Sequence, residues 1–170
     1  MSTRPLSPRF IGLLTALLAL LCDQGSKEWF SRILQTRVIP IIPNMFDFEL
    51  VHNRGAAFGM FGSLPGIWRE VVLIGVAIFA TGFILWLLFK AIDVFNGIAL
   101  GLVLGGAIGN LTDRFRFGWV VDFIHLHWYA WSWPVFNIAD STITVGIVML
   151  LWDQGNRSIV KQESSHESTR

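Results

Sequence analysis

The uncharged stretch VVLIGVAIFATGFILWLLF, from Val71 to Phe89, decides the fold class of this chain. It lies between Glu70 and Lys90 and contains no acidic or basic residue. A helix of about 20 apolar residues crosses the hydrocarbon core of a bilayer, whereas a surface helix of a soluble domain alternates apolar and polar faces. The stretch therefore predicts a transmembrane helix in an integral membrane protein.

Two further spans are predicted on the C-terminal side of this helix. Residues 95–111 are uncharged and rich in glycine. Small residues let helices approach closely in lipid, so we expect this span at the centre of a bundle. Residues 134–152 carry one charged residue, Asp140, and Pro134 suits the first turn of a helix.

The first span is predicted over residues 10–30, although its second half is polar. The apolar run ends at Cys22, and crossing length requires Asp23 and Lys27, which lie on one helix face and can pair. Basic residues, an apolar run and a cysteine are typical of a lipoprotein signal peptide. Cleavage, however, needs a small residue where this chain has Leu21. We therefore expect an uncleaved helix.

The segments between the spans predict a small sheet at the membrane surface. Residues 38–66 contain the alternation Phe46-Asp47-Phe48-Glu49-Leu50, which is typical of a strand. Residues 115–133 hold four tryptophans, which gather at the membrane–water interface. The predicted fold is a mainly α membrane protein with one domain over residues 1–170. It has a four-transmembrane-helix bundle, a small β-sheet, and a polar, disordered tail over residues 155–170.

The composition agrees with this class and excludes others. The chain is 53% hydrophobic and 15% charged, with a mean hydropathy of +0.56, whereas soluble domains carry about 25% charged residues. The net charge of +1 without a basic block gives no reason to expect nucleic acid as a partner. A single cysteine excludes an internal disulfide and a zinc site built from several cysteines.

Two carboxylates near the rim of the bundle are the candidate catalytic residues. Asp140 lies in a span, where a carboxylate costs about 2.5–3.5 kcal/mol on insertion scales and is usually kept for function. Asp122 lies in the strand-like run Val121-Asp122-Phe123. If the two face each other, they share one proton and can act as base and acid in turn. The alternatives are a structural polar contact for Asp140 and a solvated loop carboxylate for Asp122.

Polar residues near these carboxylates are weaker candidates. Asn137 shares a helix face with Asp140, and Asn110 shares one with Arg114, where both could orient a carboxylate or a peptide carbonyl. Tight packing and an interface arginine are the alternative interpretation of this region. The loop that begins at Asn53 is equally compatible with a simple turn.

No metal site is predicted. His125 and His127 are the natural ligands to consider, but the sequence offers no third ligand at a useful spacing and no His-Glu-x-x-His helix. We expect no cofactor.

Several motifs, taken in order along the chain, resemble one family. They are Asp23-Gln24-Gly25-Ser26-Lys27, Asn53-Arg54-Gly55-Ala56-Ala57-Phe58, Gly105-Gly106-Ala107-Ile108-Gly109-Asn110-Leu111-Thr112-Asp113-Arg114, Val121-Asp122-Phe123 and Phe136-Asn137-Ile138-Ala139-Asp140. With these motifs the chain resembles the bacterial lipoprotein signal peptidases (signal peptidase II) of the Pseudomonas type, which are intramembrane aspartyl endopeptidases.

The resemblance implies a function and an orientation. It implies cleavage of a diacylglyceryl-modified prolipoprotein just before the lipidated cysteine, by a monomer in the bacterial inner membrane. The termini would be cytoplasmic, and the sheet would be a periplasmic β-cradle. The Lys and Arg count alone does not decide the orientation.

The resemblance also implies residue roles. Asp122 and Asp140 would be the catalytic pair. Other residues would bind substrate or support the fold: Asn53, Arg54, Gly106, Asn110, Arg114 and Asn137 in binding, and Asp23, Lys27 and Asp113 in support.

Two other function classes are compatible with the residues alone. A proton- or ion-coupled membrane carrier also uses intramembrane carboxylates, although such carriers generally have longer chains with internal repeats. A non-enzymatic assembly factor is the third class. Cleavage of a lipid-modified substrate would distinguish the three.

Overall fold

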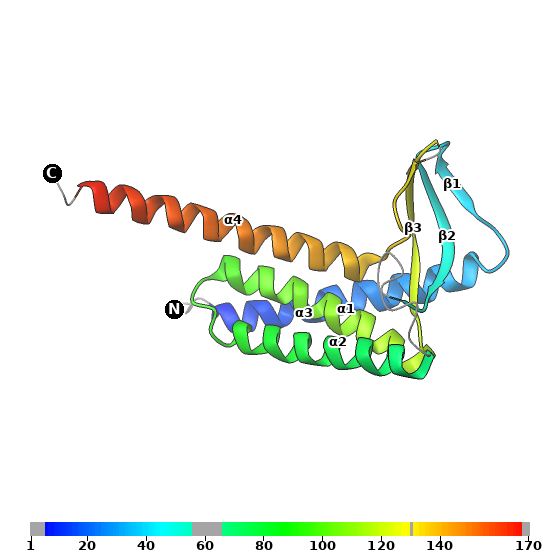
Figure 1. Cartoon of the computed structure of the whole chain (residues 1–170), viewed down its shortest axis with the longest axis horizontal. Coiled ribbons are helices and arrows are strands. Elements are labelled where there is room, and N and C mark those ends of the chain that lie inside the picture. Colours follow the sequence, from blue (N-terminus) through cyan, green and yellow to red (C-terminus); the bar gives the residue numbers. More distant parts are fainter. Residues whose placement is uncertain (1–5, 56–65, 130, 168–170) are drawn as a thin grey trace, which may run out of the picture.

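The computed structural model describes residues 6–55, 66–129 and 131–167. Within these ranges the chain forms four helices and four strands, with the helices side by side and the sheet across one end of the bundle (Figure 1). The elements in chain order are α1 (Pro8–Ile33), β1 (Ile39–Ile42), β2 (Phe46–Asn53), α2 (Gly66–Leu88), α3 (Val94–Phe117), β3 (Val120–Trp128), β4 (Trp131–Ser132) and α4 (Ile138–Glu167).

Helix α3 lies at the centre of the bundle, as its glycines predict. It contacts α1, α2 and α4, and its buried face is made largely of glycine and alanine. A Cβ placed on Gly105 would lie 2.5 Å from the carbonyl oxygen of Ala16 in α1. No larger residue fits at such a contact, so the glycines are what allow the helices to pack backbone to backbone.

Three of the described helices are long and apolar enough to cross a membrane: α1, α2 and α3. They contain the spans predicted over residues 10–30 and 95–111, and all of the span predicted over residues 71–89 except Phe89, because α2 ends at Leu88. The start of α1 and the far end of α4 both lie at the end of the bundle opposite the sheet (Figure 1).

The fourth predicted span differs from the structure at both ends. Pro134 is not in the first turn, because Phe136 still forms a β-bridge with Ile124 and α4 begins only at Ile138. The predicted disorder from residue 155 was also wrong over residues 155–167, which continue α4. Near the start of this extension Arg157 forms ion pairs with Asp153 and with Asp93, the N-cap of α3.

The sheet is antiparallel, with strand order β1-β2-β3-β4. Strand β2 confirms the alternation predicted at residues 46–50, and it pairs with β3 so that Val51 lies opposite Asp122. Phe30 at the end of α1 stacks on Phe123 of β3 with 4.3 Å between ring centroids. This aromatic contact fixes the sheet to the bundle and places β3 beside α3 and α4.

Candidate active site

The first turn of α4 is closed by the two polar residues that the sequence singled out. The Asp140 backbone N–H donates to Asn137 Oδ1 at 2.9 Å, and the Asn137 backbone N–H donates to Asp140 Oδ2 at 3.2 Å. This reciprocal arrangement is a capping box, which satisfies backbone donors that a helix start leaves without partners. The same hydrogen bonds that start the helix therefore hold the Asp140 carboxylate at a fixed position.

Strand β3 brings Asp122 to the same place. Asn137 Nδ2 donates to Asp122 Oδ1 at 2.7 Å, and Asn53 Nδ2 donates to Asp122 Oδ2 at 2.9 Å. Asn137 is fully buried and contacts both carboxylates, so the two aspartates face one site from two different elements. The alternative that Asp122 is a solvated loop carboxylate is excluded, because its exposure is 1%.

Burial sets the protonation of Asp122. Removal from water raises the pKa of the Asp122 carboxyl from 3.8 to about 7; the hydrogen bond from Asn53 opposes this rise, and the charge of Asp140 adds to it. At neutral pH a large share of Asp122 therefore carries a proton. The site can supply an acid without any other proton donor.

Asn110 orients the second carboxylate. Its Nδ2 donates to Asp140 Oδ1 at 2.8 Å, while its Oδ1 accepts from Lys27 Nζ at 2.9 Å and from Asn137 Nδ2 at 3.1 Å. Because two donors hold the carbonyl end of the amide, the NH2 end must face Asp140.

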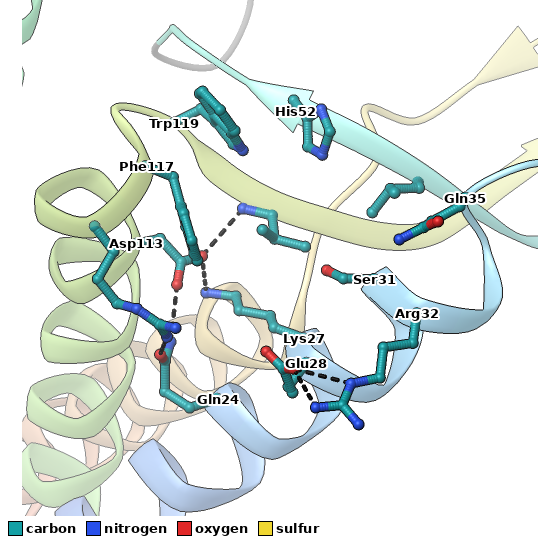
Figure 2. Close-up of a pocket in the computed structure, with 13 residues that line it drawn as sticks. Gln24, Lys27, Glu28, Ser31, Arg32, Gln35, His52, Asp113, Phe117 and Trp119 are labelled. Atoms are coloured by element: carbon teal, nitrogen blue, oxygen red, sulfur yellow. Dashed lines mark hydrogen bonds and ion pairs between the residues drawn. The ribbon is translucent and has the colours of Figure 1, made fainter.

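Beneath these residues lies a buried ion network that joins α1, α3, α4 and β3 (Figure 2). Lys27 Nζ lies 2.9 Å from Asp23 and 3.0 Å from Asp113, and all three side chains are buried. Asp113 accepts the Val121 backbone N–H, and Asp23 accepts the Ala139 backbone N–H. The network therefore fixes the backbone of the residues next to Asp122 and Asp140. Its three members are the residues for which the sequence analysis predicted a supporting role.

Arg114 and Gly106 are close to the site in different ways. The guanidinium of Arg114 donates to the Asn110 carbonyl at 3.4 Å and is near enough to interact electrostatically with Asp122 and Asp140. A Cβ on Gly106 would lie 2.6 Å from Thr142 Oγ1, so this glycine is a contact point between α3 and α4. Its predicted role in substrate binding remains a prediction.

Arg54 does not contact either carboxylate in the described residues. Its guanidinium lies over the Trp119 ring, 5.2 Å from the centroid. Residues 56–58 of the same motif lie outside the described residues.

An apolar cleft of about 490 Å³ leads away from the carboxylates. Asp140 and Asn53 line its polar end, and residues 133–136 together with Thr144 and Val145 line the rest. A second cavity, of about 590 Å³, lies on the side of Lys27 and Asp113 and is lined by neither aspartate (Figure 2). Of the two carboxylates, Asp140 thus opens onto a cleft along α4.

Comparison with known proteins gives a single answer. Residues 15–155 match the family model described as signal peptidase (SPase) II. The lipoprotein signal peptidase of Syntrophotalea carbinolica is 44% identical over 151 residues, covering 85% of this chain and 92% of that protein. The chain belongs to the signal peptidase II family. It is therefore a multi-pass bacterial membrane enzyme, an aspartic peptidase whose substrates are prolipoproteins.

Other members of the signal peptidase II family support this result. The Pseudomonas aeruginosa lipoprotein signal peptidase is 41% identical over 153 residues, with 88% of this chain and 90% of that protein covered, so the predicted resemblance to Pseudomonas enzymes is confirmed. A bacterial membrane enzyme solved by the in meso method at 1.9 Å superposes with a TM-score of 0.74 and 27% identity, over 84% of this chain and 91% of that one.

Two parts of the arrangement were missed from the sequence. Gln24 Nε2 bonds to both Asp23 and Asp113, at 3.1 and 2.9 Å, and completes the ion network. The argument that His125 and His127 lack a third ligand was also wrong, because β2 brings Asp47 to them. The pairing of β2 with β3 places Asp47 beside His125 and His127, and the spacing of these residues in the sequence does not reveal that pairing.

Proposed function

We propose that Asp122 and Asp140 are the catalytic pair of this signal peptidase II. The observation that carries the proposal is that one buried residue, Asn137, hydrogen-bonds to both carboxylates. Paired carboxylates of unequal acidity can hold a water and divide the roles of base and acid between them.

In the proposed mechanism Asp140 is the base and Asp122 the acid. The Asp140 carboxylate takes a proton from a water held between the two groups, and that water attacks the scissile carbonyl carbon. Asp122, whose raised pKa supports its being protonated, donates its proton to the carbonyl oxygen. As the tetrahedral intermediate collapses, the C–N bond breaks, the proton held by Asp140 passes to the leaving amine, and one hydroxyl proton of the intermediate returns to Asp122. Asn53 and Asn110 keep the two carboxylates in their orientations throughout.

We further propose that the substrate is a prolipoprotein whose cysteine carries diacylglycerol, cut just before that cysteine. The apolar cleft along α4 supports this proposal, since it joins Asp140 to Thr144 and Val145 of α4, the helix that we place as the fourth span. Each buried methylene of an acyl chain contributes about 0.8 kcal/mol, so chains lying in the bilayer would bring the substrate to the cleft and fix the scissile bond in register.

The proposed setting is the bacterial inner membrane, with α4 as a fourth span. Both termini would be cytoplasmic, and the sheet would be a periplasmic cradle beside the dyad. The position of both chain ends opposite the sheet supports this orientation (Figure 1). We propose a monomer, because the residues of the site all come from one chain.

The test uses Asp122→Asn and Asp140→Asn in the full chain, assayed on a diacylglyceryl-modified prolipoprotein. Each amide keeps the size of the carboxyl but cannot transfer the proton, so cleavage should fall to the background rate. Asp47→Asn, a carboxylate of the same sheet away from the dyad, is the matched control and should cleave normally. Substantial turnover by either dyad variant would refute the assignment.

A second comparison tests the lipid. The same prolipoprotein without diacylglycerol should be cut very poorly by the unaltered enzyme in the same detergent. Equal rates would show that the lipid is not recognised, while leaving the dyad assignment intact.

A further inference from the structure

A cluster of histidines and carboxylates lies on the sheet, away from the dyad. Asp47 on β2 is the direct cross-strand partner of His125 on β3, and His127 follows on the same face of β3. One ligand atom from each of these three residues lies within 4.8 Å of those of the other two. We propose that this cluster binds a divalent transition-metal ion of the zinc class.

The hydrogen bonds of His125 point to a cation. Its Nε2 lies 2.7 Å from Ser132 Oγ, and its Nδ1 is buried without a hydrogen-bond partner. If Nε2–H donates to the serine, Nδ1 carries a lone pair, and that lone pair lies 3.5 Å from the Glu49 carboxylate. A lone pair and a carboxylate oxygen repel each other at that distance unless a positive charge stands between them. A metal ion bound to Nδ1 supplies that charge, and the bond to Ser132 holds the ring in position.

The second histidine supplies a matching ligand pair. His127 Nε2 lies 2.8 Å from Asp47 Oδ2, and the two imidazole rings stack with 4.7 Å between centroids. Two protonated rings at that separation would repel each other, whereas two neutral rings bound to one ion would not. Imidazole and carboxylate together suit Zn²⁺, Cu²⁺ and Ni²⁺ better than Mg²⁺ or Ca²⁺.

The geometry requires little movement. Ligand atoms around a tetrahedral zinc are roughly 3.4 Å apart, given bonds of about 2.0–2.1 Å. The present separations of up to 4.8 Å need only small rotations of half-buried side chains. Glu49, whose carboxylate lies 3.5 Å from His125 Nδ1, is the nearby group that could move in as a further ligand. The ion would fasten β2 to β3.

This site is separate from the catalytic centre. His125, the member of the cluster nearest to Asp122 along β3, is three positions from it, which is about 10 Å along an extended strand. Chelators should therefore leave peptidase activity unchanged while removing the ion.

The experiment measures binding of Zn²⁺ alone to the full chain in detergent, purified without a polyhistidine tag and stripped of metal. Calorimetry should show one saturable equivalent of Zn²⁺ per chain. The His127→Gln variant should bind at least about tenfold more weakly. The His52→Gln variant is the matched control, because His52 lies on β2 outside the cluster, and it should bind like the unaltered chain.

A second variant and a second probe keep the test decisive. Asp47→Asn keeps the size of the side chain and should lower the affinity in the same way, even if His127→Gln perturbs the fold. Co²⁺ bound to the unaltered chain should give the intense visible absorption of a four-coordinate site, which both variants should lose. Absence of a saturable equivalent, or unchanged binding by both variants, would show that these residues only hydrogen-bond across the strands and would overturn the proposal.

Discussion

Replacing Lys27 by methionine should destabilise the fold severely, whereas the same change at Arg32 should not. Both residues form i,i+4 ion pairs on α1, Lys27 with Asp23 and Arg32 with Glu28. Figure 2 shows the pair of Arg32 with Glu28 and the contact of Lys27 with Asp113. The Lys27 side chain is 4% exposed and that of Arg32 is 74% exposed. The two substitutions therefore compare the loss of an i,i+4 ion pair in a buried environment, at Lys27, with its loss in an exposed environment, at Arg32, within the same helix.

The magnitude follows from the contacts that each cation makes. Lys27 Nζ lies 2.9 Å from Asp23 and 3.0 Å from Asp113, and each contact amounts to about 6 kcal/mol of attraction at an effective dielectric constant of about 20, before desolvation. Removing one partner of a buried ion pair costs about 3–5 kcal/mol, because a buried charge is left without compensation. An exposed i,i+4 pair contributes only about 0.3–0.5 kcal/mol, which sets the expectation for Arg32→Met.

The assay is denaturant unfolding in detergent micelles, with the free energy of unfolding compared between the two variants. A third variant, Asp23→Asn/Lys27→Met/Asp113→Asn, removes the charges together and should recover much of the lost stability. It should still cleave slowly, because Asn110 loses the donor that fixes its amide toward Asp140. If Lys27→Met costs no more than Arg32→Met, the network does not stabilise the fold and the reasoning from burial fails.

Two further outcomes are expected. Because the pKa of Asp122 is raised from 3.8 to about 7, its contribution to stability is complete below pH 3.8 and is lost as the pH rises through about 7. Cleavage that needs the protonated acid should fall over the upper part of the same range, so a pH–rate profile flat from pH 5 to 9 would contradict the assignment of the proton. Gly106→Ala should lower both stability and turnover, because its Cβ would meet Thr142 Oγ1 at 2.6 Å and displace the helix that carries Asp140. Gly75→Ala in α2, where a Cβ meets nothing within 4 Å, is the control and should be neutral or slightly stabilising in the same unfolding assay.

The spans were predictable because lipid imposes a simple rule. Crossing a bilayer takes about 20 apolar residues, and the uncharged stretch from Val71 to Phe89 is long enough to do so. Its local composition alone was therefore sufficient for the prediction. The central position of α3 was also predictable from the sequence, because glycines in a membrane helix, such as Gly105, allow neighbouring helices to approach closely.

The boundaries of the last helix were not predictable, because tertiary contacts set them. Pro134 is a good first residue for a helix, but the β-bridge between Ile124 and Phe136 keeps the chain extended past it. At the other end, Arg157 finds Asp93 on a different element, and composition alone cannot reveal that a polar segment has such a partner. In both cases a contact between distant residues overrides the local preference.

The candidate dyad shows why residue types were easier to predict than their arrangement. A carboxylate in an apolar span is costly, so Asp140 could be singled out from its surroundings alone. The placement of Asp140 beside Asp122 depends on Asn137, which closes the first turn of α4 and also hydrogen-bonds to Asp122 on β3. One buried amide thus does two things: its backbone N–H and side-chain oxygen start the helix, and its side-chain nitrogen bonds to Asp122 on the strand. The position of the helix start and the approach of the two carboxylates therefore depend on different atoms of one residue, Asn137.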